Sequence, residues 1–136
     1  MIVQNGWKWF LSKSIVANLA NLKVALAKAD FDDTDGTLEY GDMVFADYPG
    51  YANLAYALDS STPIITADPY GKLTSVTFTF QPVSIVTPQT IYGIFLYEDV
   101  TPGLICCNRF GAPVVLSADT DKIERGIDFY DQSFVV

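Results

Sequence analysis

Two stretches near the middle of the chain have the hydrophobic pattern of neighbouring β-strands. In Leu73–Phe80 the apolar residues Val76, Phe78 and Phe80 alternate with serine and threonine, which is the period of a strand with one buried face. Ile91–Tyr97 is instead apolar on both faces, as is typical of a central strand or of a strand that contacts a partner. We expect the two strands to form the centre of an antiparallel sheet.

A helical period occurs over residues 5–19. Asn5 can cap its start by accepting a hydrogen bond from a backbone amide. Trp9 falls off the apolar stripe, so its ring is either partly exposed or packed sideways. The stripe itself is formed, at spacings of three and four residues, by Trp7, Phe10, Leu11, Ile15 and Leu19.

The rest of the chain is predicted to form short strands separated by turns that contain proline and glycine. The turn sequence at residues 68–71, with proline second and glycine last, predicts a hairpin between Ile64–Ala67 and Leu73–Phe80. The other predicted strands are Leu22–Lys28, Ile91–Glu98, Leu104–Phe110, Pro113–Ser117 and Ile123–Phe129. About seven strands at intervals of roughly ten residues predict one all-β domain over residues 1–136. We expect an antiparallel β-sandwich, jelly-roll-like, with one N-terminal α-helix.

Length and composition favour a single domain without a membrane span. The chain has 136 residues, of which 50% are hydrophobic and 14% are aromatic, so disorder over most of it is not expected. No apolar run reaches the roughly 18 residues of a transmembrane helix, and the N-terminus lacks the pattern of a secretion signal. We therefore expect a protein made in a cytoplasm, with no membrane partner.

The net charge of −8 is concentrated in one segment. Residues 29–71 contain nine acidic residues and no basic one, whereas the remaining chain has seven acidic and eight basic residues. Such a balance repels a polyanion, which argues against nucleic-acid binding. The simplest interpretation of the acidic segment is a solvated, solubilising face.

The residues of common catalytic sites are missing or badly placed. The chain has no histidine, and the adjacent Cys106 and Cys107 are expected to be buried small side chains that point to opposite faces of a strand. No phosphate-binding, dinucleotide-binding or hydrolase motif is present. Glu98 and Asp99 precede a turn, where acidic residues are ordinarily solvated. We therefore expect no enzyme activity and no cofactor.

The acidic turn at residues 30–36 invites comparison with a calcium site. Placing Gly36 at the sixth position of an EF-hand loop puts Phe31 at the first position, where a ligand is needed. The EF-hand interpretation therefore fails. A calcium site of another kind stays an alternative, formed by Asp32, Asp33 and Asp35.

The connection at residues 37–53 carries aromatic side chains beside acidic ones. Pro49 and Gly50 fit the middle of a type II turn, because proline presets its own φ and glycine accepts a positive one. The flanking Tyr48 and Tyr51 either anchor this loop onto the sheet or, together with Trp9, form a carbohydrate-binding surface. Anchoring is the commoner use of such aromatic residues.

An excess of apolar residues predicts association. The mean hydropathy of +0.23 is high for a small monomer. Extra apolar surface in a small domain often lies at a subunit interface, so we expect a homo-oligomer. The candidate interface residues are Trp9, Tyr92, Ile94, Leu96 and Arg125, of which the last stands on an otherwise apolar strand face.

Several motifs occur in an order that resembles a known group of proteins. After the helix and the acidic stretch, GYA occurs at residues 50–52, IYGIFLYED at residues 91–99 and LICCNRFGAPVVLSADT at residues 104–120. This order resembles small hypothetical virion proteins of tailed bacteriophages, in which a Y-G-(F/Y)-(F/L) strand precedes an RF-x-x-P hairpin. Tyr92 and Gly93 match the first element, and Arg109, Phe110 and Pro113 match the second.

The resemblance implies a role in the phage particle and carries over no catalytic residue. We therefore expect a non-enzymatic structural protein of the virion, assembled in the bacterial cytoplasm. The first expectation is a capsid decoration or cement protein that binds the major capsid protein. A tail, baseplate or fibre component is the alternative in the same class, and a carbohydrate-binding module is the alternative of another class.

Overall fold

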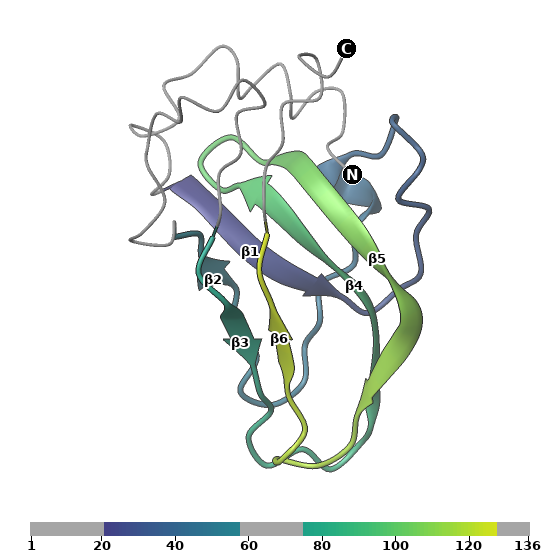
Figure 1. Cartoon of the computed structure of the whole chain (residues 1–136), viewed down its shortest axis with the longest axis vertical. Coiled ribbons are helices and arrows are strands. Elements are labelled where there is room, and N and C mark those ends of the chain that lie inside the picture. The colour runs from purple at the N-terminus through teal and green to yellow at the C-terminus, as the bar shows by residue number, and fades with distance from the viewer. Residues whose placement is uncertain (1–20, 58–74, 128–136) are drawn as a thin grey trace.

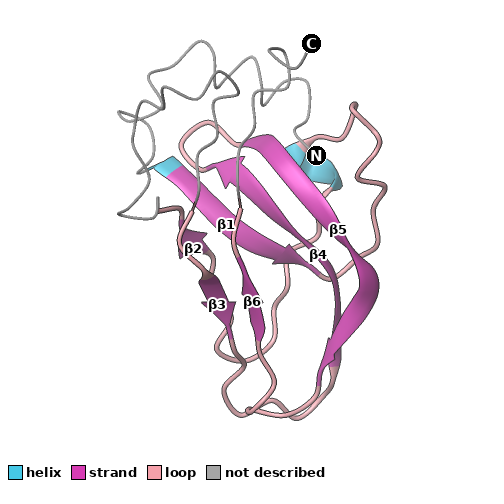
Figure 2. Ribbon diagram, viewed as in Figure 1, coloured by secondary structure: helices cyan, strands magenta, loops and turns pink. Residues whose placement is uncertain are grey.

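The computed structural model describes residues 21–57 and 75–127, which form mostly antiparallel β-structure (Figures 1 and 2). A four-stranded sheet has the order β2-β1-β4-β5, and a two-stranded ribbon pairs β3 with β6. Within the described residues, no helix has the length and apolarity needed to cross a membrane. The elements are β1 (Leu22–Ala27), the 3-10 helix η2 (Tyr40–Asp42), β2 (Leu54–Ala55), β3 (Phe78–Phe80), β4 (Gln89–Glu98), β5 (Gly103–Leu116) and β6 (Ile123–Arg125).

The all-β class predicted from the sequence is confirmed. The helix predicted over residues 5–19 and the first arm of the hairpin, Ile64–Ala67, lie outside the described residues. The predicted strand Leu22–Lys28 is confirmed as β1, and its even-numbered residues enter one core while Ala25 and Ala27 enter another. The sandwich and jelly-roll arrangement stays a prediction.

The strand that is apolar on both faces is central, as predicted. β4 lies between β1 and β5 and is antiparallel to both, with Phe95 opposite Ala25 on one side and Cys107 on the other. The stretch Leu73–Phe80 is not its neighbour, because β3 pairs with β6. The prediction that both stretches form the centre of one sheet is therefore wrong. Alternation identifies a buried face, but it does not say which strand is hydrogen-bonded to which.

The sequence predicted separate strands at Leu104–Phe110 and Pro113–Ser117, which is wrong, since β5 runs through both. Arg109 lies opposite Gly93 and Val114 lies opposite Ile91, so residues 110–113 form an irregular stretch between two paired segments. Proline is tolerated here because β5 is the outermost strand of the described sheet, where a missing N–H breaks no ladder bond. Figure 1 shows β5 as one long strand that bends in its lower half.

Both faces of the four-stranded sheet are covered by other parts of the chain. The ribbon and the tyrosines of the connection before and after β2 close a first core on one face. The connection that follows β1 closes a second core on the other face, with Phe31, Leu38, Tyr40 and Phe45 packed against Phe95 and its neighbours. The described part of the acidic segment therefore covers the sheet with its apolar side chains, while nearly all of its carboxylates are exposed to solvent, which agrees with the predicted solvated face.

Candidate functional site

Three strongly exposed valines lie toward one end of the molecule. Val86 is 89% exposed and Val83 is 62% exposed, and both belong to the loop at residues 81–88 that joins β3 to β4. Val115 is 54% exposed and lies opposite Thr90, near the end of β5. We call these three residues the valine tip. Figure 1 places the loop before β4 and the turn from β5 to β6 together at the lower end of the molecule.

The loop that carries the valine tip is held at several points. The Val83 N–H donates to the carbonyl oxygen of Pro49 at 2.9 Å, and the Ile85 N–H donates to Oδ1 of Asp119 at 2.9 Å. The Gln81 side chain donates to the Asp119 carbonyl oxygen at 2.6 Å. These bonds join the loop to two other connections, so the valines project from a fixed backbone.

Ser84 adds a conformational constraint to the same loop. Its φ of 57° lies in the left-handed region, which is uncommon for a residue with a side chain. Such a conformation costs about 1–2 kcal/mol and persists where the surroundings enforce it, often at functional positions. The loop is therefore strained at a position between two apolar side chains that face solvent.

The turn at residues 48–51 packs closely against the loop at residues 81–88. Gly50 has a φ of 83°, and Tyr51 donates its N–H to the Tyr48 carbonyl oxygen at 2.9 Å, as the predicted type II turn requires. A Cβ added at Gly50 would lie 2.9 Å from Cβ of Val83, so this position needs glycine for space as well as for φ. The valine tip is thus built from chain segments that are distant in sequence.

The valine tip can contact a partner through exposed apolar side chains. Burying an exposed valine side chain against a partner contributes about 1.5 kcal/mol, so two or three such residues offset part of the cost of association and would form the apolar centre of a larger contact. The sequence contained one signal for it, a short apolar run at residues 83–86 between Pro82 and Pro88. Because prolines bound this run, its pattern is typical of a connection between strands rather than of a docking surface.

The interface residues predicted from the sequence are not brought together. Ile94 and Leu96 are fully buried in the first core, so their prediction as contact residues is wrong: β1, β5 and the ribbon already cover them. Tyr92 is half-buried, and Arg125 is exposed with its guanidinium carbon 5.1 Å from the centre of the Phe110 ring. Trp9 lies outside the described residues.

Tyr48 and Tyr51 anchor their loop onto the sheet. Tyr48 is buried and packs edge-on against Tyr51, with 5.2 Å between ring centres. Burial raises the pKa of Tyr48 to about 12 and also raises the pKa of Tyr51. Both rings pack against the first core, as the anchoring alternative predicts, and buried Tyr48 has no ring face to offer a sugar. Trp9, the third residue of the glycan prediction, lies outside the described residues.

The acidic turn uses its carboxylates for local and tertiary hydrogen bonds. Oδ1 of Asp32 accepts from both the N–H and the hydroxyl of Thr34, at 2.9 and 2.6 Å, and these bonds lower its pKa. Asp33 instead accepts the Arg109 N–H at 2.9 Å. In the described part of the chain, no three acidic or cysteine side chains are placed to hold a metal ion. The calcium alternative at Asp32, Asp33 and Asp35 has no support from this geometry.

The two cysteines and Glu98 have roles in the folded structure. Cys106 and Cys107 are buried, in the first and the second core respectively, and are not joined to each other, as predicted. Glu98 is also buried, and its carboxylate accepts the N–H groups of Val100 at 3.3 Å and Thr101 at 2.5 Å. The expectation of a solvated Glu98 is therefore wrong, because the carboxylate holds the turn between β4 and β5.

Comparison with known proteins identifies no relative, so a functional assignment depends on the geometry of the chain and on the order of its motifs. No family model, no curated protein and no solved structure matches the chain.

Proposed function

We propose that this chain is a non-enzymatic structural protein of a tailed-phage virion, and that it decorates and stabilises the capsid. The observation that carries the proposal is the valine tip, which presents Val83 and Val86 from a strained and well-held loop. The order of motifs that resembles small phage virion proteins supports the same role. The tip is the surface that contacts the major capsid protein.

The fold is suited to this role because, among the described residues, other segments already cover both faces of the sheet. The apolar side chains of β4 are used inside the chain, so docking at the tip does not require the core to open. We further propose that the ribbon and the sheet are parts of a jelly-roll-like sandwich with an N-terminal helix. In the particle the protein forms a symmetric homo-oligomer, assembled in the bacterial cytoplasm.

Purified particles of the phage that encodes the protein provide the test. We expect hundreds of copies per particle by quantitative mass spectrometry, and density on the capsid surface by electron microscopy. A few to a few tens of copies, at the tail, would overturn the decoration role in favour of a tail or baseplate component. Absence from the particles would overturn both.

Substitution of the tip tests the surface itself. Val83→Asp with Val86→Asp introduces two charges where apolar contact is proposed, and we expect incorporation into particles to fall at least tenfold. The matched control is Val100→Asp, because Val100 is 72% exposed and lies beyond the opposite end of β4. Equal incorporation of both variants would show that the tip is not the docking surface.

A further inference from the structure

A carboxylate lies directly beside the valine tip, on the turn that joins β5 to β6. Oδ1 of Asp119 accepts the Ile85 N–H at 2.9 Å, and Ile85 is the residue before Val86 in the loop. Asp119 is exposed, and among the described residues its second carboxylate oxygen has no hydrogen-bond partner. One oxygen therefore holds the loop, while the other is open to solvent beside an exposed apolar side chain.

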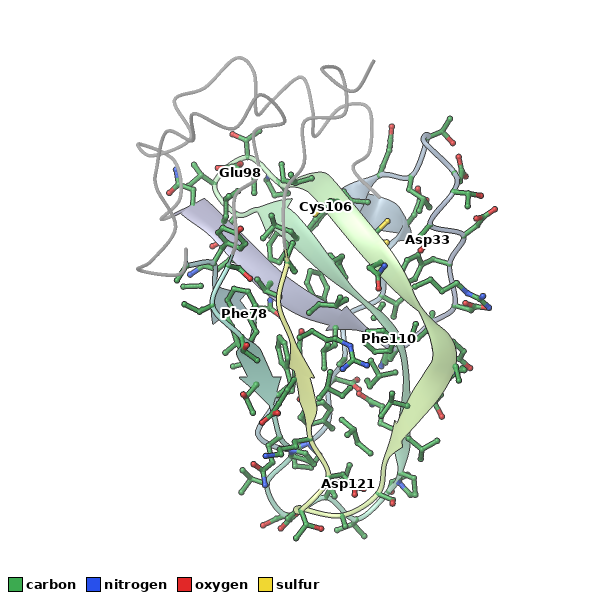
Figure 3. All side chains as sticks on the ribbon, viewed as in Figure 1. Asp33, Phe78, Glu98, Cys106, Phe110 and Asp121 are labelled. Atoms are coloured by element: carbon green, nitrogen blue, oxygen red, sulfur yellow. The ribbon has the colours of Figure 1, made fainter. Side chains whose placement is uncertain are left out.

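Asp121 provides a second carboxylate on the same turn. Its Oδ2 accepts the N–H groups of Ser117 at 2.8 Å and of Ala118 at 3.0 Å. These bonds lower the pKa of Asp121, so the side chain is charged at neutral pH. Figure 3 shows Asp121 at the lower end of the molecule, where Figure 1 places the loop of the valine tip.

The basic residue of this turn is already paired with another carboxylate. Lys122 follows Asp121, and its Nζ lies 3.0 Å from Oε1 of Glu124. Among the described residues, no basic side chain lies within salt-bridge distance of Asp119 or Asp121. Their hydrogen-bond donors are neutral N–H and O–H groups. The surface beside the valine tip therefore carries two negative charges that no described cation neutralises.

We propose that the valine tip docks into an apolar hollow of the major capsid protein that is bordered by lysine or arginine side chains. This inference rests on the proposed function and names the chemistry of the partner surface. The valines supply the apolar centre of the contact, and Asp119 and Asp121 supply part of its polar rim. Cations on the partner complement these two charges, steer the encounter and disfavour acidic surfaces.

Asparagine substitutions separate the charge from the structural role of each carboxylate. The amide oxygen of asparagine can accept the same N–H groups as a carboxylate oxygen. Asp119→Asn therefore removes a charge while it keeps an acceptor for the Ile85 N–H, and Asp121→Asn does the same for the turn. Unchanged urea unfolding of the variants checks that the fold is retained.

Asp99→Asn is the matched control. Asp99 is exposed, and its side chain has no hydrogen bond or ion pair among the described contacts. It directly follows Glu98, which Figure 3 shows at the upper end of the molecule. The control therefore changes the net charge by the same amount, far from the valine tip.

The test measures binding of the purified full chain to particles of the same phage that were assembled without it. Co-sedimentation gives the apparent Kd at about 0.05 M and about 0.5 M sodium chloride, since added salt screens exposed charges. We expect Asp119→Asn and Asp121→Asn each to raise Kd about threefold at the lower salt concentration, the size typical of an exposed ion pair. At the higher concentration both should bind like the unmodified chain, and Asp99→Asn should do so at both.

Two outcomes would overturn the inference alone. The first is binding of both tip variants that equals or exceeds that of the unmodified chain at the lower salt concentration. The second is equal weakening by Asp99→Asn, which would assign the effect to net charge. Asp119→Asn alone decides the matter if Asp121→Asn does not fold. Failure of the unmodified chain to bind at either salt concentration would instead overturn the proposed function together with this inference.

Discussion

The hydroxyl of Tyr51 accepts the backbone N–H of Leu26 at 3.0 Å and donates to Oδ1 of Asn53 at 2.6 Å. Asn53 in turn donates from Nδ2 to the Tyr97 hydroxyl at 2.8 Å. A tyrosine side chain thus takes the place that a strand would occupy beside β1. This short network links the loop before β2 to the central strand, and it gives the first prediction.

Tyr51→Phe should lower the free energy of unfolding by about 1–3 kcal/mol, because the Leu26 N–H is left without its acceptor. Urea unfolding at neutral pH measures the change. The control is Tyr92→Phe, since the Tyr92 hydroxyl has no hydrogen bond among the described contacts; we expect a loss within about 0.5 kcal/mol. Equal losses in the two variants would contradict a structural role for the Tyr51 hydroxyl.

Gly93→Ala should be strongly destabilising. The added methyl would lie 2.4 Å from the Asn108 carbonyl oxygen, which is backbone and cannot rotate away. We expect a loss of about 1–3 kcal/mol, as for overpacked cores. Gly111→Ala on β5 is the matched control, because nothing lies within 4 Å of its added Cβ. Thermal unfolding of the two variants distinguishes them, and similar melting temperatures would show that Gly93 does not lie against the Asn108 carbonyl oxygen.

Ser84 tests the strain in the loop of the valine tip. Ser84→Gly should be neutral or stabilising by up to about 1 kcal/mol, because glycine adopts a positive φ without steric cost. Ser84→Val should be destabilising by about 1–2 kcal/mol, since a β-branched residue is poorly tolerated there. Denaturant unfolding gives both values. The reverse order of stability would mean that Ser84 does not adopt the left-handed conformation.

Protonation of Asp30 should weaken its ion pair with Arg109, in which the guanidinium donates from Nε to Oδ1 at 2.6 Å and from Nη2 to Oδ2 at 2.9 Å. The hydrogen bond from Arg109 holds the pKa of Asp30 below 3.8, its value in an unfolded chain. A lowered pKa stabilises the folded state above the unfolded value, and this contribution is lost as the pH falls through the folded pKa. The stability difference between the unmodified chain and Asp30→Asn should therefore be present at pH 7 and shrink below pH 3.8.

Arg109, which keeps its charge, is the charged group that acts on Asp30 in this titration, and the same guanidinium also interacts with the carboxylates of Asp33 and Asp32. Carboxyl carbon chemical shifts followed by NMR report the Asp30 titration directly. A midpoint at or above 3.8 would contradict the ion pair with Arg109.

Both thiols should be unreactive in the folded protein. Burial raises the pKa of Cys106 to about 12 and that of Cys107 to about 11, so little thiolate exists at pH 8. A colorimetric disulfide reagent should label neither thiol within minutes under native conditions. In guanidinium chloride it should label both cysteines of the chain. Rapid native labelling would show that the strand carrying them opens readily.

Local patterns were informative where burial follows the strand period. The apolar run of β4 predicted a central strand, and the alternation of Leu22, Val24 and Leu26 predicted β1. Adjacent cysteines in a strand predicted side chains in different cores. Each of these inferences depends on residues that are close in sequence, so no knowledge of the pairing partners was needed.

The candidate docking surface was less predictable. Val83 and Val86 lie in a stretch bounded by prolines, which sequence analysis treats as a connection. Their exposure depends on Pro49 and Asp119, which hold the loop from two other parts of the chain. The interface prediction for Ile94 and Leu96 depended equally on distant contacts. An apolar strand can be covered by a partner or by its own chain, and here other segments of the same chain cover both residues.

Local patterns were enough to predict a chain of antiparallel strands, a central strand that is apolar on both faces, and a tight turn between Tyr48 and Tyr51. They could not predict that β3 pairs with β6, or that the connection after β1 covers the sheet through Phe31 and Phe45. These contacts join segments that are far apart along the chain. The ion pair between Asp30 and Arg109 joins residues 79 positions apart, and no local pattern of polarity reports such a partner.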